Sequence, residues 1–256
     1  MKRLFITIIL ASVMMSASAV AGPSAKFAAT YGNDGPYLVS VAFIDDAVED
    51  TVVFDRHEGF TFATIKVPQQ KELLIGLSAE IGITTDTSIK GKNGGAARSI
   101  AGGRAHVLVF ACLVGTDDCT ALARPGRVTL SQRVQTLSAT LGGVIESCED
   151  LNDDGVIDVK TECEVSDEEI GLALETLASH HFNFVLPNMD QGEYNVIAFF
   201  VTGAVAEVDI DEASVDAGGT VSASAFASAW IGSYMFTLQQ VRATKGGIID
   251  RDIIEP

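Results

Sequence analysis

Apolar and polar residues alternate with a period of two along most of the chain, in short stretches separated by Gly, Pro, Asn and Asp. Valine, isoleucine, threonine and aromatic residues dominate these stretches, which is typical of half-buried β-strands. In the first half, the pattern predicts strands over residues 37–43, 51–54, 60–67, 73–84, 105–113 and 128–141. Helical periodicity is scarce, so an all-β fold is favoured over an α/β fold.

The second half continues this alternation around one clear hairpin. Residues 182–186 and 194–201 are predicted to be its strands, with the turn at residues 187–192. Residues 166–169 have capping-box spacing, but the alternation that follows predicts one short turn and then a strand. Further strands are expected over residues 204–210 and 234–243, and residues 221–229 fit either a strand or a helix. Short strands at this spacing predict an antiparallel β-sandwich.

Residues 90–104, KGKNGGAARSIAGGR, form a basic, glycine-rich stretch. A phosphate-binding loop would lead from glycines into Lys-Ser/Thr and a helix, and this stretch does neither. We therefore expect a mobile hairpin loop here, whose bases can meet the acidic loop of the same or another molecule.

The first 21 residues have the pattern of a signal peptide. Lys2 and Arg3 precede an apolar run, residues 4–15, that is too short to span a bilayer, and small residues follow at the expected cleavage site. We expect cleavage near Ala19 or Ala21 and a secreted or periplasmic protein, with residues 22–256 forming a single β-sandwich domain. No membrane insertion is expected.

The chain has four cysteines, an even number, which in an exported protein favours two disulfides. Three pairings are possible. Proximity in sequence favours the two local bonds, Cys112–Cys119 and Cys148–Cys163, each worth about 2–3 kcal/mol in the chain-entropy model.

Acidic residues concentrate in one segment that interrupts the strand pattern, at about residues 143–168. Between Glu146 and Glu169 there are eleven acidic residues and one base, Lys160, which gives a local charge of −10 within a formal total of −17. Such a run repels itself and stays extended unless a cation or a cross-link holds it compact. A chain this acidic is also a poor partner for nucleic acid or anionic membranes.

The segment between the last two cysteines places oxygen-bearing residues at calcium-loop spacing. Asp150, Asn152, Asp154 and Asp158 fall at positions 1, 3, 5 and 9 of such a loop, and Gly155 falls at position 6, where the chain must reverse sharply. The sequence DLNDDGVID thus resembles the calcium loops of EF-hands, dockerins and thrombospondin type 3 repeats, over about a dozen residues.

This resemblance implies a structural Ca²⁺ site with side-chain ligands Asp150, Asn152, Asp154 and Asp158 and the carbonyl of Val156. It also implies that the apolar Ile157 packs beneath the loop. Position 12, which should supply a bidentate carboxylate, is Thr161, and Glu162 comes one residue late. Glu162 is therefore the sixth candidate ligand. The alternative is an Asx-rich solvated turn held by the disulfide.

No catalytic motif stands out. His180 and His181 are adjacent, and adjacent side chains on a strand point to opposite faces, so they do not share one metal ion. The acidic residues 209–212 fit a second cation site or, more simply, a solvated strand end.

We therefore expect a calcium-stabilised binding, surface or matrix protein whose ligand is an unidentified protein or glycan. The alternatives are a secreted hydrolase acting on polysaccharide, which would use two carboxylates across a groove, and a calcium-dependent adhesin.

Overall fold

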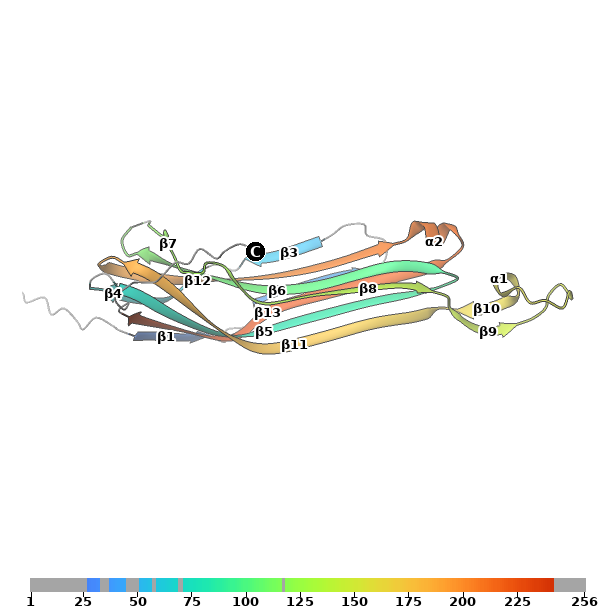
Figure 1. Cartoon of the computed structure of the whole chain (residues 1–256), viewed down its shortest axis with the longest axis horizontal. Coiled ribbons are helices and arrows are strands. Elements are labelled where there is room, and N and C mark those ends of the chain that lie inside the picture. The colour runs from blue at the N-terminus through green and yellow to red at the C-terminus, as the bar shows by residue number, and fades with distance from the viewer. Residues whose placement is uncertain are drawn as a thin grey trace, which may run out of the picture.

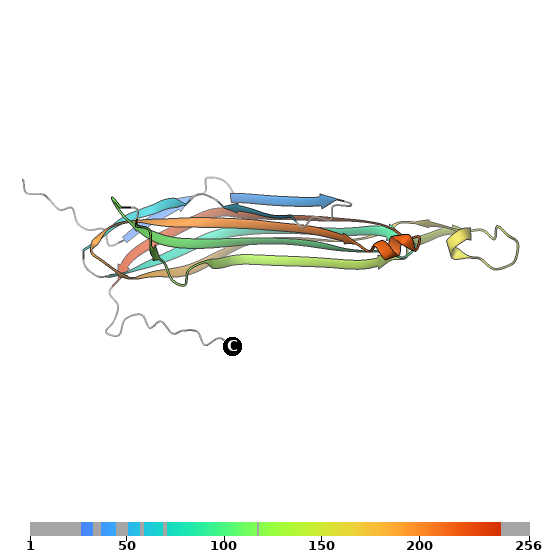
Figure 2. The same cartoon turned by 90° about the horizontal axis from the view of Figure 1, so that it is seen from above.

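The computed structural model describes residues 27–32, 37–44, 51–56, 59–68, 71–116 and 118–241. Two antiparallel sheets pack face to face along one long axis, and a small ribbon projects from one end (Figures 1 and 2). The predicted all-β sandwich is confirmed. The expected signal peptide, residues 1–21, lies outside the described residues.

One sheet has the strand order β1-β13-β5-β11, and β2 also pairs with β13. Its strands are β1 (Phe27–Gly32), β2 (Tyr37–Ile44), β5 (Lys71–Lys92), β11 (Glu168–Met189) and β13 (Thr220–Val241).

The other sheet has the order β3-β12-β6-β7, with β4 also paired to β12 and β8 to β6. Its strands are β3 (Thr51–Arg56), β4 (Phe60–Val67), β6 (Gly95–Leu113), β7 (Ala121–Leu122), β8 (Val128–Leu141) and β12 (Gly192–Ile210).

Five strands are much longer than the sequence pattern predicts. β5, β11 and β13 each contain 22 residues and β6 and β12 contain 19, so these strands are about 63–73 Å long at 3.3 Å per residue. The predicted strands 194–201 and 204–210 are one strand, and so are 221–229 and 234–241, while residues 242 and 243 are not described. Among the predicted bounds, those of β4 and β8 are correct.

Residues 90–104 contain the expected hairpin, but they are strand apart from the turn at residues 93–94, so the expected long loop was wrong. β5 and β6 meet in a two-residue turn, where Asn93 and Gly94 have φ of 55° and 84°. An Asn-Gly pair favours this tight hairpin turn, because both residues tolerate positive φ. The later Gly103 faces the opposite sheet, and a Cβ there would lie 2.8 Å from Ile83 Cγ2. Glycine is therefore used here for close packing of the two sheets.

Apolar side chains from both inner faces fill the sandwich in two clusters. The larger cluster contains Phe184, Phe200 and Phe236, and the smaller one, nearer the projecting ribbon, contains Ile89 and Val208. Polar groups also lie inside. Gln135 of β8 accepts a hydrogen bond from Thr85 Oγ1 (3.0 Å) and donates to Thr87 Oγ1 (2.8 Å).

Both predicted disulfides are present. Cys112, near the end of β6, is bonded to Cys119, and Cys148 is bonded to Cys163. Local pairing leaves the long strands free of cross-links between the two sheets. The disulfides therefore close two short segments outside the long strands, and noncovalent contacts hold the two sheets together.

Candidate functional site

The acidic insertion forms the ribbon that extends beyond the end of the sandwich (Figures 1 and 2). Strands β9 (Val144–Cys148) and β10 (Cys163–Ser166) pair antiparallel, with Cys148 directly opposite Cys163. The short helix α1 (Val159–Glu162) precedes β10. The disulfide thus fixes the two ends of the candidate calcium loop at neighbouring positions of one ladder.

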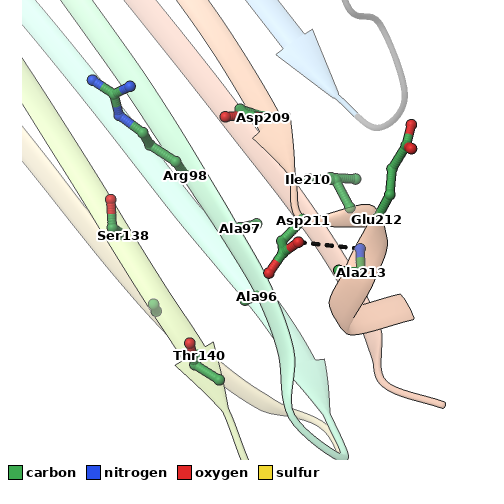
Figure 3. A pocket seen from close by; sticks show the side chains of 11 residues that line it. Ala96, Ala97, Arg98, Ser138, Thr140, Asp209, Ile210, Asp211, Glu212 and Ala213 are labelled. Carbon is green, nitrogen blue, oxygen red and sulfur yellow. Dashed lines mark hydrogen bonds between the residues drawn. The ribbon is translucent and has the colours of Figure 1, made fainter. Parts of the chain in front are cut away.

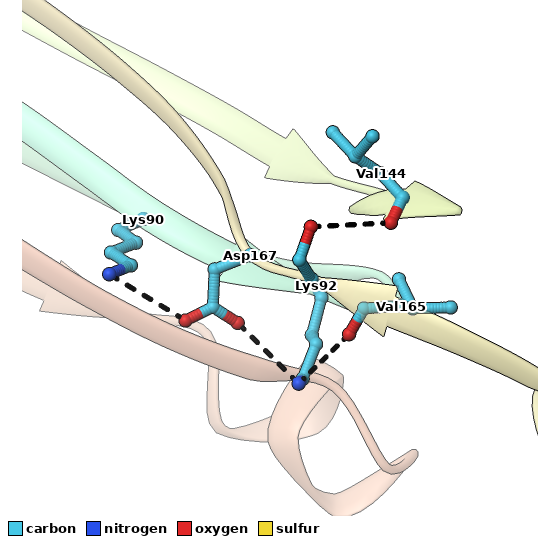
Figure 4. A network of polar contacts seen from close by, with 6 residues as sticks. Lys90, Lys92, Val144, Val165 and Asp167 are labelled. Carbon is cyan, nitrogen blue, oxygen red and sulfur yellow. Dashed lines mark hydrogen bonds and ion pairs between the residues drawn. The ribbon is translucent and has the colours of Figure 1, made fainter. Parts of the chain in front are cut away.

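Two lysines of β5 hold the base of this ribbon (Figure 4). Lys92 Nζ donates to the carbonyl of Val165 (3.1 Å) and lies 3.8 Å from Asp167 Oδ1, and Lys90 Nζ lies 3.9 Å from Asp167 Oδ2. These lysines belong to the basic stretch of residues 90–104. They contact Asp167 and Val165 at the base of the insertion, outside the acidic loop between Cys148 and Cys163. The turn predicted at residues 166–169 is reduced to Asp167, which separates β10 from β11.

The first half of the loop is organised by side-chain oxygens that accept hydrogen bonds from backbone N–H groups. Asp150 Oδ2 accepts from Gly155 N (2.8 Å), Asn152 Oδ1 from Asp154 N (2.9 Å) and Asp154 Oδ1 from Val156 N (2.7 Å). Asx side chains fold short turns in this way. Three of the predicted side-chain ligands therefore curl around one short segment of backbone.

Gly155 permits this reversal, because its φ of 79° lies in the left-handed region that side chains with a Cβ avoid. Asp153 also has positive φ, 55°, which aspartate tolerates better than most residues. Position 6 of the loop thus has the backbone conformation that the sequence predicts.

The second half of the loop is closed by Glu162. Its side chain is only 8% exposed, and its Oε2 accepts a hydrogen bond from Asp158 N (2.7 Å). Its backbone carbonyl accepts from Glu149 N (2.9 Å), while Asp158 Oδ1 caps α1 by accepting from Lys160 N (3.0 Å). Thr161, at position 12, is exposed. The late glutamate, and not the residue at the expected position, is therefore the buried carboxylate here.

One carboxylate oxygen of the loop lacks a partner. Asp150 Oδ1 is buried and has no hydrogen-bond partner among the described residues. Buried polar atoms are normally paired, because an unpaired one loses its hydration without compensation. A cation beside Asp150 would satisfy this oxygen at position 1, where a calcium loop places its first ligand.

Other features of the loop differ from the resemblance. Ile157 is 48% exposed and does not pack beneath the loop, and Val156 is 69% exposed. Within the described residues, no three His, Cys, Asp or Glu side chains are gathered closely enough to hold a metal ion. Nothing here tests the full ligand set of Asp150, Asn152, Asp154, Val156, Asp158 and Glu162, which stays a prediction.

An open groove of about 620 Å³ lies on the sandwich near the same end (Figure 3). β6, β8, the end of β12 and the helix α2 (Glu212–Asp216) line it, and α2 was missed in the sequence analysis. Asp211 caps α2 by accepting from Ala213 N (3.1 Å). The acids Asp209, Asp211 and Glu212 all lie on one side, while β8 contributes Ser138 and Thr140. This groove therefore lacks the two facing carboxylates that glycoside hydrolysis requires.

A smaller hollow of about 300 Å³ lies at the opposite end of the sandwich, near the Cys112–Cys119 bond. Burial raises the pKa of Tyr194, which lines it, and the carboxylates of Asp190 and Asp118 raise it further. A hydrogen bond from the Thr120 hydroxyl lowers the pKa of Asp118. The hollow is thus acidic, but among the described residues no three His, Cys, Asp or Glu side chains gather there closely enough to hold a metal ion.

The two adjacent histidines point to opposite faces of β11, as predicted. His181 pairs with Ser78 and its Nδ1 lies 3.0 Å from Ser78 Oγ, whereas His180 pairs with the buried Ala79. His180 Nε2 is buried without a partner among the described residues. The pair therefore does not form a joint metal site.

The comparisons with known proteins supply no family. No protein-family model matches the chain, and neither does any curated protein. A chain in the structure of infectious bursal disease virus Gx strain aligns with 82% of this chain and 42% of that one, at 10% identity and a TM-score of 0.13. One from the Gt strain covers 82% and 43%, at 10% identity and a TM-score of 0.14. This chain thus spans less than half the length of either. TM-scores this low carry no argument.

The described residues contain no helix long and apolar enough to cross a membrane. The two disulfides are compatible with a non-cytoplasmic location, because thiols are kept reduced in the cytosol.

Proposed function

We propose that this chain is an exported, calcium-stabilised β-sandwich that acts as a binding, surface or matrix protein. The observation that carries the proposal is Asp150 Oδ1, a buried carboxylate oxygen without a partner at the first ligand position of the loop. The loop closes on itself through Asp150, Asn152 and Asp154, and the disulfide holds its ends. The ion relieves repulsion within a segment of local charge −10 and orders the tip of an elongated molecule.

A calcium titration followed by thermal unfolding tests the proposal. An incomplete ligand set corresponds to a dissociation constant of about 10⁻⁴–10⁻³ M. Millimolar calcium should then stabilise the folded chain by about 0.4–1.4 kcal/mol. For a chain of this size, the melting temperature rises by about 1–5 °C.

Matched variants locate the effect. Asp154→Ala should abolish the shift, and so should Asp150→Asn, which keeps an acceptor for Gly155 N but removes the charge beside the ion. Glu149→Ala removes an equal charge outside the ligand set and should retain most of the shift. Magnesium should substitute poorly, because this loop cannot easily form a compact octahedron. No shift in the wild type, or an equal shift in Asp154→Ala, contradicts the proposal and leaves a solvated acidic turn.

The calcium-dependent adhesin is a second candidate, favoured by the apolar side chains at the loop tip. Leu151 is 70% exposed, Val156 69% and Val159 48%, and all three belong to the segment between Cys148 and Cys163. An ordered loop would present them to a protein or glycan. A glycan array probed with the labelled chain, in calcium and in chelator, tests the glycan form. Glycan binding that requires calcium and is lost in Asp154→Ala supports the adhesin proposal. Glycan binding that is unchanged in chelator contradicts it.

A further inference from the structure

β11 is a 22-residue strand at the edge of its sheet. On its open side, the described residues provide only the isolated bridge between Arg124 and Val185, near one end of the strand. The remainder, from Glu168 to Asn183, has no strand beside it within the described part of the chain. This is the longest open edge there, and it lies on the sandwich body away from the calcium loop.

The bridge shows which backbone groups of β11 face outward. Val185 exchanges both of its backbone hydrogen bonds with Arg124, on the side away from β5. In an antiparallel ladder, alternate residues direct both their N–H and C=O groups to the same side. The pairing of β11 with β5 keeps one register up to Leu186. The odd-numbered residues from 169 to 183 therefore present their backbone groups to the open edge.

Along residues 168–183, this edge has no lysine, proline or bulge, and its acidic residues are Glu168, Glu169 and Glu175. Natural edges are blunted by lysines, prolines, bulges or covering segments. Residues 168–189 include no lysine or arginine, and Pro187 and the register shift both come after the Arg124 bridge. On the far side of the same sheet, β1 and β2 cover β13. The open edge of β11 is thus suited to accept a further strand.

Apolar side chains along this edge are only partly covered. Ile170, Leu172 and Leu174 pair with the buried Ile89, Thr87 and Thr85, so they lie on the inner face of the sheet. They are nevertheless 44%, 43% and 42% exposed.

The position of β8 explains this exposure. Gln135 of β8 reaches both Thr87 of β5 and the Leu172 carbonyl of β11. β8 therefore lies above the gap between β5 and β11, and the edge of β11 extends past the opposite sheet.

We propose that β11 pairs antiparallel with β11 of a second copy of this chain, around a two-fold axis at Thr176. In this register Ile170 lies opposite Phe182 of the second copy, Leu172 opposite His180 and Leu174 opposite Ala178, so the exposed apolar strip is covered. The acids within the paired segment meet neutral residues, because Glu169 lies opposite Asn183 and Glu175 opposite Leu177. The paired segment ends at Asn183, just before the bridged Val185.

Neighbouring registers fit less well. An axis at Glu175 places two Glu175 carboxylates opposite each other, and an axis at Leu172 places Glu169 opposite Glu175, which is unfavourable. An axis at Leu177 requires Val185, whose backbone groups are already bonded to Arg124. Axes at Ala173 or Leu174 pair fewer residues. The two-fold axis makes the interface self-complementary and closed.

Sedimentation analysis of the full chain over a wide concentration range tests the association. The wild type should reach twice the monomer mass, whether or not calcium is present. Leu172→Lys/Leu174→Lys should remain monomeric, because two lysines would be buried against the second copy. Both leucines are more than two-fifths exposed, so circular dichroism should show an intact fold. The matched control Val114→Lys/Leu122→Lys adds the same charge at exposed positions outside β11 and should remain dimeric.

A wild type that stays monomeric at every concentration overturns the proposal. So does a dimer that survives in Leu172→Lys/Leu174→Lys, or one that the control variant loses, because either result places the contact elsewhere. A calcium-dependent melting shift is measured separately, so the two proposals fail independently.

Cysteine cross-linking tests the register. Residues at a non-hydrogen-bonded antiparallel pair have Cα atoms about 4.5 Å apart, within the range that a disulfide spans. Since the described cysteines are all in disulfides, Thr176→Cys adds a single free thiol that should form a covalent dimer on mild oxidation. Ala173→Cys is the control. It lies opposite Ser179, so its two thiols are about 20 Å apart along the strands. Equal cross-linking of both variants rules out this register.

Discussion

The carboxylate of Glu162 accepts a hydrogen bond from the backbone N–H of Asp158 at 2.7 Å, and this side chain is only 8% exposed. In a standard calcium loop, the bidentate glutamate stands at position 12, which is the exposed Thr161 here. The buried glutamate one residue later therefore closes the loop through this hydrogen bond.

We predict that Glu162→Gln reduces the calcium-induced melting shift by at least half. Glutamine keeps an oxygen that can accept from Asp158 N but removes one negative charge and the bidentate carboxylate, and calcium affinity depends on the number of charged ligands. Glu164→Gln, an exposed neighbour of equal charge, is the control and should keep the full shift. An undiminished shift in Glu162→Gln would exclude Glu162 from the ligand set.

Replacing residues 149–162 by a short Gly/Ser linker should leave a folded sandwich. Cys148 and Cys163 are retained and still face each other on β9 and β10. The apolar clusters lie inside the sandwich, and surface insertions change the closure entropy only slowly with length. Cooperative thermal unfolding of the variant checks this. Loss of cooperativity would mean that the insertion contributes to the core.

Gln135→Leu should lower the free energy of unfolding by about 1–3 kcal/mol, because Thr85 Oγ1 then lacks its buried acceptor. The substitution keeps the approximate volume of the side chain, so the loss reports on hydrogen bonding rather than on a cavity. Urea unfolding measures it. Gln132→Leu, at an exposed position of the same strand, should stay within about 0.5 kcal/mol of the wild type. Equal effects from both variants would argue against a structural role of this polar group.

His106 should make the protein less stable as the pH falls. Burial lowers its pKa, and the nearby Arg127 and Arg104 guanidinium groups lower it further. As the pH falls, His106 is therefore protonated near its ordinary pKa of about 6.5 in the unfolded chain. In the folded chain, its ring stays neutral to a lower pH. Stability contributed by the neutral ring is complete above about pH 6.5 and declines as the pH falls toward the lowered folded pKa.

The comparison of wild type with His106→Gln isolates this contribution from the acidic residues. The difference in unfolding free energy between the two proteins should shrink between about pH 7 and pH 5. Glutamine can still meet Thr129 Oγ1, which lies 2.9 Å from His106 Nδ1. A difference that stays constant across this range would contradict the assignment.

Local chemistry in the sequence determined several features correctly. The alternation of residues 60–67 and 128–141 predicted β4 and β8 with their bounds, because a period of two is a property of the strand itself. Cysteine proximity predicted both disulfides. In the loop, the spacing of Asp150, Asn152 and Asp154 predicted side chains that curl around one turn, and the structure shows that turn.

Tertiary contacts decided the remainder. The sequence pattern suggested strand breaks at Gly103 and Gly203. In the structure, β6 and β12 continue through these glycines because the two strands hydrogen-bond to each other there. Ile157 is exposed, since the loop projects beyond the end of the sandwich.

The same holds for the inward-facing residues of β11. The alternation of Ile170, Leu172 and Leu174 marked one face of a strand, but whether that face is covered depends on where β8 lies. Alternation along the sequence therefore determined which residues share a face, and only the packing of one sheet on the other decided which of those faces is buried.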